Sequence, residues 1–489
     1  MSPALKAFLA LILPPFQVSR PPFAAITKLY EAYHILVRND WLDNLEALHR
    51  RYGPVVRIGP NELHFNDHEF CLAHHRRPDL GKCTNYYGLL DTLLGGLASP
   101  HRHTERKSIM QPLFSGATLS QFSATTMNSI LDSLHNRLTD ASRAVSGPVN
   151  ATHYLWAYTN DIMVSYLVGE DKGYLGRDLQ VVHDELRAFS AIELATVLRT
   201  MPIAKKAIEV FPALRQYSPL AWLDNLVLEN LKPMMKSYKD PEAHHEKDRQ
   251  SVLARLWTQL GQDAQIVAQE AAQALFIGNE SLLSNLTFLL HNMMKNPGCI
   301  AKLRAELDNL DVSMYGHRIW RDFKVLRLLY LDTLCRESTR LSSPGWHRQP
   351  RQTAEPVDYK GTVIPPMTSM RFTLHMLEHD PLLYPEPNSF KSDRWLSNDA
   401  QSQKAMASSV TFGTGTRTCL GQFIARQVLR KTLAGLVYNF NFSLCEEGEG
   451  EGEGESKKGG SEFPYLTTYP RKWYEGFMHV RLTPRFQSI

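Results

Sequence analysis

The chain has 489 residues, of which 43% are hydrophobic and 21% charged, and its formal net charge is +4. This composition is that of a globular protein with a sizeable core, and it argues against general disorder and against a nucleic-acid partner. Six cysteines without any C-x-x-C spacing argue against a zinc site or a disulfide framework. No linker divides the middle of the sequence, so we expect one large unit, residues 25–489.

Residues 1–24 differ in character from the rest of the chain. Their uninterrupted apolar run, Ala7 to Leu13, is far shorter than the about 20 residues that a membrane-spanning helix needs. A proline-rich spacer, Pro14 to Pro22, follows it in place of a signal-peptide cleavage site. We interpret the segment as a short or truncated membrane anchor with its linker, and the alternative is a disordered tail.

The remaining elements predict a fold that is mainly α with small β-sheets. An amphipathic helix begins at Lys28, and two apolar arms at 55–58 and 63–65 flank turn residues, which predicts a hairpin. Helical periodicity dominates from about Pro112 to Leu310. A second hairpin at 357–364 turns at Lys360-Gly361, and the Glu/Gly-rich stretch 446–460 is expected to be a solvated loop between the last strands.

The strongest chemical signal is the stretch Phe412-Gly-Thr-Gly-Thr-Arg417-Thr-Cys419-Leu-Gly421, which leads directly into a helical stretch from Gln422 to Tyr438. Its glycines allow a tight loop and the close approach of a flat ligand. A cysteine at the start of a helix lies near the positive end of the helix dipole, which favours the thiolate. The alternative is a cysteine that merely occupies a glycine-rich loop.

Two further patterns lie upstream of this stretch. Glu337 and Arg340 share one face of an apolar-periodic helix, and Arg394 follows about 50 residues later; a surface ion pair is the ordinary alternative. A long apolar helix, Val267 to Lys295, has one polar interruption at 278–281, where Glu280 and Ser281 need partners if they are buried.

Together these patterns resemble the cytochrome P-450 superfamily, because 412–421 matches its Phe-x-x-Gly-x-Arg-x-Cys-x-Gly signature at every fixed position. The resemblance implies heme b between two long helices. It implies Cys419 as the axial thiolate ligand of the iron, Arg417 as a partner of a haem propionate and Phe412 as a neighbour of the thiolate. Glu337, Arg340 and Arg394 would form the structural triad that holds the cysteine loop, although Asp393 replaces the more usual glutamate.

The resemblance also implies further propionate partners. Arg351, which precedes the second hairpin, matches a propionate-binding arginine of the superfamily. His103 and Lys107 occupy the positions of the usual Trp-x-x-x-Arg pair, with Arg106 as the alternative to Lys107 and a solvated basic run as the bland interpretation.

The polar interruption at 278–281 is similar to the oxygen-activating segment of the superfamily. Ser281 stands where threonine is usual and Ile277 where a small residue is usual. Ser281 and Glu280 are therefore expected to deliver protons to the reacting oxygen through water. A serine that bonds back to its own helix is the alternative.

The resemblance implies a monooxygenase that uses O2 to oxidise an apolar small molecule. The local sequence at 28–34 and 52–63 is similar to that of fungal secondary-metabolism members of the family, the trichodiene oxygenase group among them. The expected substrate is a terpenoid or polyketide. No flavin or nicotinamide fingerprint is present, so we expect an NADPH-cytochrome P-450 reductase to dock on a basic face with Arg426, Arg430 and Lys431. We expect the protein to contact membrane lipid at the cytosolic face of the endoplasmic reticulum. The alternatives are a haem-thiolate isomerase or dehydratase and a non-catalytic haem-binding protein.

Overall fold

A computed structural model describes residues 21, 24, 26–38, 40–87, 91, 93–144, 148–169, 173–178, 251–260, 264–311, 313–342, 349–445 and 478–486. Nearly all of the anchor-like segment 1–24 and the whole Glu/Gly-rich stretch 446–460 lie outside the described residues. So does the part of the predicted helical region between 179 and 250.

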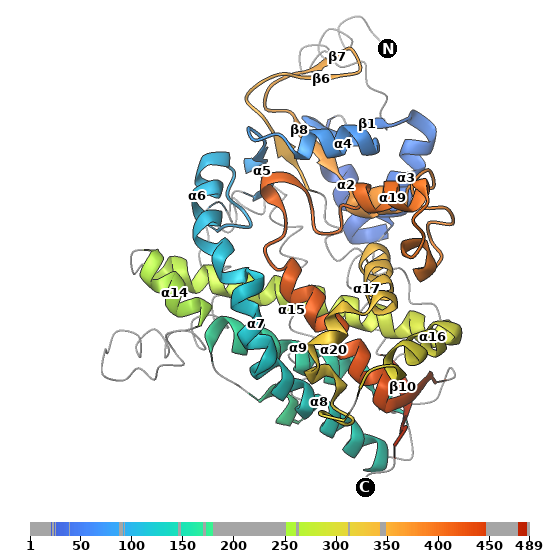
Figure 1. The fold of residues 1–489 in the computed structure, drawn as a ribbon. Helices are drawn as coiled ribbons and strands as arrows, with labels where there is room; N and C mark the ends of the chain where they lie inside the picture. The colour runs from blue at the N-terminus through green and yellow to red at the C-terminus, as the bar shows by residue number, and fades with distance from the viewer. Residues whose placement is uncertain are drawn as a thin grey trace, which may run out of the picture.

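The described chain is mostly helical, as the sequence predicts (Figure 1). Its α-helices are α2 (Leu29–Tyr33), α3 (Trp41–Tyr52), α4 (His68–His75), α5 (Thr84–Tyr87), α6 (Pro100–Met110), α7 (Gly116–Ala124), α8 (Thr126–Ala144), α9 (Ala151–Val168), α14 (Val252–Gln259), α15 (Ala264–Lys295), α16 (Pro297–Asp308), α17 (Leu329–Ser342), α18 (Leu374–Glu378), α19 (Ala400–Ser408) and α20 (Gln422–Asn439). One π-helix, η1 (His34–Arg38), follows α2, and short 3₁₀ turns include η8 (Phe323–Arg327) and η9 (Ser392–Trp395).

The long helix α15 forms the centre of the helical core. It packs against α9, α17 and α20, and all three lie around it in Figure 1. At Gly278 the helix lies close to α9, because a Cβ atom there would meet the side chain of Met163. The predicted bounds of α15, 267–295, agree with the observed helix within three residues.

Three small sheets complete the described part of the fold. The largest has the strand order β1-β2-β8-β5-β3, with β2 and β8 parallel, and the smaller ones are β4-β10-β9 and the hairpin β6-β7. Their bounds are β1 (Val55–Gly59), β2 (Glu62–Phe65), β3 (Gly81–Lys82), β4 (Val149–Asn150), β5 (Arg351–Gln352), β6 (Val357–Tyr359), β7 (Thr362–Ile364), β8 (Ser369–Phe372), β9 (Phe440–Leu444) and β10 (His479–Pro484).

Both predicted hairpins are confirmed. β1 and β2 pair antiparallel across the turn at 60–61, and β6 and β7 pair across Lys360 and Gly361. These two turn residues have φ angles of 50° and 83°, the left-handed values that a two-residue hairpin turn requires. β9 and β10, the strands on either side of the Glu/Gly-rich stretch, also pair antiparallel.

Buried ion pairs fasten the first helix to the largest sheet. Arg371 on β8 is fully buried, and its guanidinium lies 2.9 Å from Glu31 on α2 and 2.6 Å from Glu62 on β2. Lys28 also pairs with Glu62, at 3.0 Å. Among the described residues, no helix is both long enough and apolar enough to cross a bilayer.

A buried histidine pair lies beside this sheet. His49 Nε2 lies 2.7 Å from His64 Nδ1, and His64 Nε2 lies 2.8 Å from the Thr373 hydroxyl. Burial lowers the pKa of His49 to about 4, and it also lowers the pKa of His64. Both rings are therefore neutral in the folded protein at neutral pH.

We predict that this pair makes the protein sensitive to acid. The folded-state pKa lies below the unfolded value, so the unfolded chain binds the proton more tightly, and stability is lost as the pH falls from about 6.5 towards about 4. At about pH 5, His49 alone should cost roughly 2 kcal/mol relative to neutral pH. Urea unfolding of His49→Gln should show a shallower pH dependence than the wild type. The control His101→Gln, at an exposed site on α6, should leave that dependence unchanged.

Candidate active site

The cysteine loop, residues 410–421, closes on itself before α20 begins. The Cys419 amide donates to the Phe412 carbonyl at 2.8 Å, and the Gly413 amide donates to the Val410 carbonyl at 2.7 Å. Gly413 and Gly415 have φ angles of 70° and 67°, which favour glycine. The loop therefore fixes the place of Cys419 immediately before the first turn of α20.

Gly415 also permits a close contact with α4. A Cβ atom at this position would lie 2.5 Å from the His75 carbonyl oxygen and 3.1 Å from Arg76 Cα. Both are backbone atoms, so the neighbouring chain cannot move aside cheaply. The tip of the cysteine loop is thus pressed against the end of α4.

Cys419 differs from the other cysteines in its surroundings. It is exposed, whereas Cys71, Cys83 and Cys335 are buried and Cys299 and Cys445 are half-buried. Protein atoms nevertheless surround its thiol closely enough for burial to raise its pKa. The amides of Gly421 and Gln422 and the Lys107 ammonium act in the opposite direction. The helix amides thus act in favour of the thiolate, as the sequence predicts, and burial outweighs them for the thiol alone; a bound metal ion deprotonates its thiol ligand outright.

Three cations gather near this loop, and we call Lys82, Arg351 and Arg417 the cation cluster. Antiparallel pairing of β3 with β5 places Lys82 opposite Arg351. Burial lowers the pKa of Lys82, and repulsion from Arg351 and Arg417 lowers it further. Burial, then Arg351, lowers the pKa of Arg417 to about 10.

Within the described residues, no carboxylate pairs with the cation cluster. Arg417 donates to the Leu97 carbonyl at 2.8 Å, Arg351 donates to Gln349 Oε1 at 2.9 Å, and Lys82 donates to the Gly95 carbonyl. The buried Nε of Arg351 has no hydrogen-bond partner among the residues that the structure describes. Buried positive charge without compensation is costly, so the cluster suits a ligand that brings carboxylates.

The predicted helix residues around His103 have separate roles in α6. His103 is buried, and burial together with Arg417 lowers its pKa to about 3. Lys107 donates to the carbonyls of Thr416 and Thr418, at 2.6 and 3.1 Å, so it braces the cysteine loop. Arg106 pairs instead with Glu270 on α15, at 2.6 Å.

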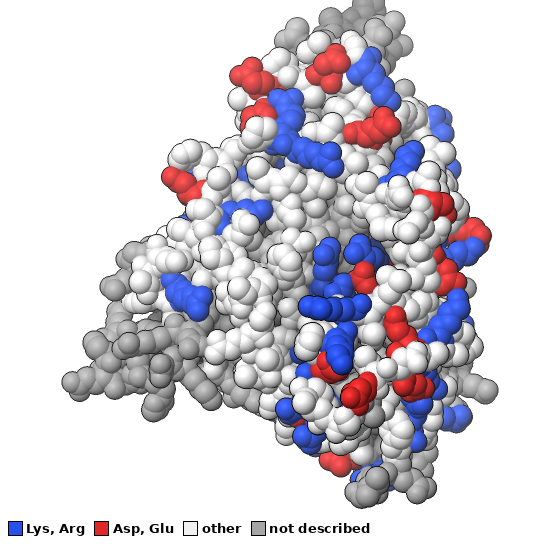
Figure 2. Space-filling model, viewed as in Figure 1, with Lys and Arg blue, Asp and Glu red and all other residues white. Residues whose placement is uncertain are grey.

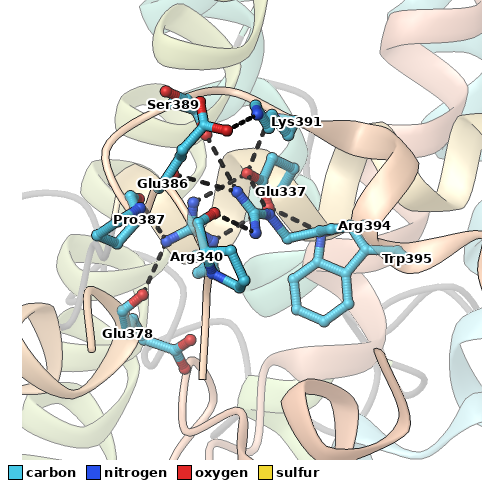
Figure 3. A network of polar contacts seen from close by, with 10 residues as sticks. Glu337, Arg340, Glu378, Glu386, Pro387, Ser389, Lys391, Arg394 and Trp395 are labelled. Atoms are coloured by element: carbon cyan, nitrogen blue, oxygen red, sulfur yellow. Dashed lines mark hydrogen bonds and ion pairs between the residues drawn. The ribbon is translucent and has the colours of Figure 1, made fainter. Parts of the chain in front are cut away.

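The structure joins Glu337, Arg340 and Arg394 in one buried network (Figure 3). Glu337 Oε1 accepts from Arg340 and Arg394 at 2.9 and 3.0 Å, and its Oε2 accepts from the Trp395 indole at 2.8 Å. Burial raises the pKa of Glu337, but the two arginines outweigh burial and leave it below its ordinary value. Asp393 takes no part in this network and pairs with Lys302 at the surface.

Sequence reasoning missed Glu378, which connects this network to the cysteine loop. Arg340 donates to the Glu378 backbone carbonyl at 2.7 Å, as Figure 3 shows. The Glu378 side chain accepts the Val410 amide and also the hydroxyls of Ser409 and Thr411, each at 3.1 Å. Its only sequence signal is a carboxylate at the end of a short, mostly apolar helix, α18.

Lys82 was missed as well, for a different reason. It comes close to Arg351 only through the pairing of β3 with β5, two strands that are far apart in sequence. Neither its neighbours in the chain nor its spacing carries a motif. Only the tertiary structure identifies it.

The polar interruption of α15 contains a carboxyl group, Glu280, that is a weaker acid than usual. Burial raises the pKa of Glu280 to about 7. Ser281 Oγ donates to the Gly278 carbonyl at 3.2 Å, which is the back-bonded arrangement that the sequence left open as an alternative. Ile277 is about half exposed, at 51%, in the same stretch, so its bulk projects away from the packed core.

Comparison with known proteins agrees with this architecture. The chain matches the cytochrome P450 family over residues 20–459. It is 25% identical to a cytochrome P450 monooxygenase of Aspergillus terreus, over 87% of this chain and 86% of that protein. It is 26% identical to a tryptophan 6-hydroxylase of Fusarium equiseti (87% and 85% covered) and 25% identical to an N-acetyltryptophan 6-hydroxylase of Emericella nidulans (89% and 87% covered).

A helical protein with a cysteine loop ahead of a buried helix, and with a buried cation cluster, has the features of a haem-thiolate oxidoreductase. The chain belongs to the cytochrome P450 family, whose members use haem with a cysteine thiolate as axial ligand. The uncompensated cation cluster fits the two carboxylates of that cofactor.

We predict that Gly415→Ala damages the cysteine loop. The substitution adds a Cβ 2.5 Å from the His75 oxygen at a left-handed φ, so it should destabilise the fold by about 2 kcal/mol or more and lower the haem bound per chain. Gly116→Ala is the control, because its Cβ would meet nothing within 4 Å. Thermal unfolding and haem content measure both effects. Equal behaviour of the two variants would show that the contact with α4 is unimportant.

Proposed function

We propose that this protein is a haem-dependent monooxygenase in which Cys419 is the axial ligand of the iron. One observation carries the proposal: the exposed Cys419 stands at the end of a loop that Lys107 links to α6, close to buried cations without carboxylate partners. The bound haem would supply the activation of dioxygen, and the chain would hold the cofactor, exclude water and deliver protons.

Arg351, Arg417 and His103 are the proposed partners of the haem propionates, and we add Lys82 to them. The four lie close together, since burial and then repulsion from Arg351 and Arg417 lower the pKa of both Lys82 and His103. Burial also keeps water from screening these side chains. Phe412 would lie near the thiolate, since its carbonyl accepts the Cys419 amide and its ring receives the Arg426 guanidinium at 5.2 Å. Lys107 is proposed to hold the loop instead of a propionate.

Glu280 and Ser281 are the proposed proton donors on α15. A carboxyl group with a pKa of about 7 both holds and releases a proton near neutral pH, which suits a general acid. The Ser281 hydroxyl donates a hydrogen bond to the Gly278 carbonyl in the structure, but its oxygen can still accept a hydrogen bond from water. A rotation of this hydroxyl would let it pass a proton on.

A separate NADPH-cytochrome P-450 reductase is the proposed electron donor, and the structure changes the residues expected at its docking surface. Lys431 is buried and bonds to Ser123 and Asn128, so its predicted place on the surface is wrong. Arg430 pairs with Asp332. Figure 2 shows Lys and Arg side chains gathered over the α17–α20 region.

The revised docking surface consists of cations near the start of α20. Arg426 lies near Arg336, since repulsion from Arg336 adds to burial in lowering the pKa of Arg426. The 3₁₀ turn η8, which packs against α20, adds two exposed cations, Lys324 and Arg327. Exposed Phe323, at 62%, lies among them. Cations around an apolar centre fit an acidic protein partner.

The proposed substrate is an apolar small molecule of fungal secondary metabolism, a terpenoid or polyketide. Relatives of this chain are named fungal monooxygenases, and two are named tryptophan or N-acetyltryptophan hydroxylases. Their names support oxygen insertion but do not select among these substrate classes. Deleting the gene and identifying the accumulated intermediate would reveal the substrate. A requirement for both reductase and O2 would separate a monooxygenase from an isomerase, a dehydratase or a non-catalytic haem protein.

We also propose attachment to the endoplasmic reticulum membrane at its cytosolic face. Apolar side chains line one face of the first helical turns at helical spacing, and each is about half exposed or more: Ile26, Leu29, Tyr33 and Val37. Val363 and Met367 are exposed as well, at 63% and 51%, and Asn61 on the β1–β2 turn holds the Met367 carbonyl at 3.1 Å. This apolar surface follows directly after the anchor-like segment.

We predict that Cys419→Ala abolishes the red-shifted Soret band that the reduced protein gives with carbon monoxide, because that band requires a thiolate ligand. Cys445→Ala, at a half-buried site after β9, should keep the band. Visible spectra of the reduced carbon monoxide complexes measure both. Survival of the band in Cys419→Ala would overturn the assignment.

We predict that Ser281→Ala binds haem normally but diverts electrons into hydrogen peroxide. The hydroxyl's proposed role is to pass protons, and the iron does not need it as a ligand. The peroxide released per NADPH consumed, measured with reductase and the identified substrate, should rise several-fold. Loss of a general acid typically slows a reaction much more than this, and water can replace part of the lost proton transfer. Ser281→Thr should release no more peroxide per NADPH than the wild type. Ser284→Ala, on the same helix, is the control and should behave like the wild type. An unchanged ratio in Ser281→Ala would place the proton path elsewhere.

We predict that the full chain stays in the membrane pellet at high salt, since apolar contacts do not weaken with ionic strength. Deleting residues 1–22 should move a substantial share to the soluble fraction with the haem spectrum intact. Adding Leu29→Asp and Val37→Asp to that deletion should release more, because both side chains are exposed. Fractionation followed by immunoblotting measures the shares. A full-length protein that is soluble throughout would contradict the proposal.

A further inference from the structure

Residues 93–98, which we call the bridging segment, lie between α15 and the cation cluster. On the α15 side, the Leu94 amide donates to both carboxylate oxygens of Glu270, at 2.9 and 3.1 Å. The next amide, Gly95, donates to Gln273 Oε1 at 2.9 Å. Glu270 and Gln273 are three residues apart on α15, so they share a face of the helix.

Glu270 joins a third element to this contact. Its Oε1 also accepts from Arg106 on α6 at 2.6 Å, and the carboxylate is buried, with 1% exposed. Gly95 leaves room for the Gln273 side-chain amide, because a Cβ at position 95 would lie 2.5 Å from Gln273 Oε1. The buried Glu270 carboxylate thus binds one cation, Arg106, and one backbone amide, that of Leu94. Both groups would lose their partner if they moved away from the carboxylate, so it holds them firmly.

The other edge of the bridging segment holds the cation cluster. Its carbonyl groups accept from Lys82 at Gly95 and from Arg417 at Leu97, the latter at 2.8 Å. The Lys82 amide donates to the Ala98 carbonyl at 3.1 Å. The segment thus directs the amides of Leu94 and Gly95 towards α15, and the carbonyls of Gly95 and Leu97 towards the cations proposed to bind the haem carboxylates.

We propose that Glu270, together with Arg106 and Gln273, is a positioning residue that fixes the bridging segment and thereby holds Lys82 and Arg417 in place for the haem carboxylates. This proposal rests on the proposed function, since it assigns those cations to haem. Loss of the Glu270 carboxylate leaves Arg106 and the Leu94 amide without partners, so the segment loosens. The cations on its far edge then lose their fixed directions, and the cofactor leaves more readily.

The test uses Glu270→Ala in the haem-loaded protein. Hydrogen exchange of peptides that cover 93–98 should become faster, and transfer of haem to excess apomyoglobin should become about tenfold faster, the effect of one lost charged hydrogen bond. The ferric spectrum should keep its thiolate character, because Cys419 is untouched.

A matched control separates positioning from general loss of stability. Asp161 on α9 is also a buried carboxylate that accepts two consecutive amides, those of Tyr174 and Leu175 at 2.7 and 2.9 Å. Asp161→Asn should lower the melting temperature without changing exchange at 93–98 or the rate of haem loss. The proposal is overturned if Asp161→Asn loses haem as fast as Glu270→Ala, or if Glu270→Ala loses haem at the wild-type rate.

Two further variants keep the proposal testable if Glu270→Ala does not fold. Glu270→Gln keeps an oxygen for the Leu94 amide but loses the ion pair, and Arg106→Gln removes the same pair from the other side. Both should speed haem loss, and the double variant should lose haem no faster than the worse single variant, because the two act through one contact. Additive effects would overturn it. A wild-type protein without the thiolate spectrum would refute the proposed function itself, whatever these variants do.

Discussion

The fold around the site depends on one buried charge, the carboxylate of Glu337. A carboxylate that is fully buried is stable only when cations and donors surround it, and Glu337 receives Arg340, Arg394 and the Trp395 indole. These partners come from α17 and from the segment at 391–395, so the charge draws the two together. Arg340 then extends the network to the Glu378 carbonyl.

From Glu378 the constraint passes to the cysteine loop. Its side chain holds the Val410 amide, the Val410 carbonyl accepts the Gly413 amide, and the loop closes where Cys419 donates to Phe412. Each of these hydrogen bonds is 2.8 Å or shorter, and consecutive bonds of this kind make the path stiff. The geometry of the proposed thiolate ligand therefore originates in an ion pair on a different helix.

The opposite side of the site is organised by a second buried carboxylate. Glu270 binds α6 through Arg106 and the bridging segment through its amides, while the cation cluster lies on the far side of that segment. Glu337 and Glu270 each have an arginine partner, whereas no carboxylate of the described residues pairs with the cation cluster, so an anionic ligand fits beside that cluster. The family's cofactor carries two such carboxylates.

The sequence alone determined the family, the helical class, the bounds of α15 and α20 and the motif residues, because local periodicity and a fixed spacing around Cys419 carry that information. It could not reveal that Arg106 belongs to Glu270, that Lys431 is buried, or that burial outweighs the helix amides at the Cys419 thiol. Those outcomes depend on which chain segments pack together and on how much solvent they exclude. Lys82 and Glu378 acquire their roles only when residues distant in sequence meet, so only the tertiary structure decided them.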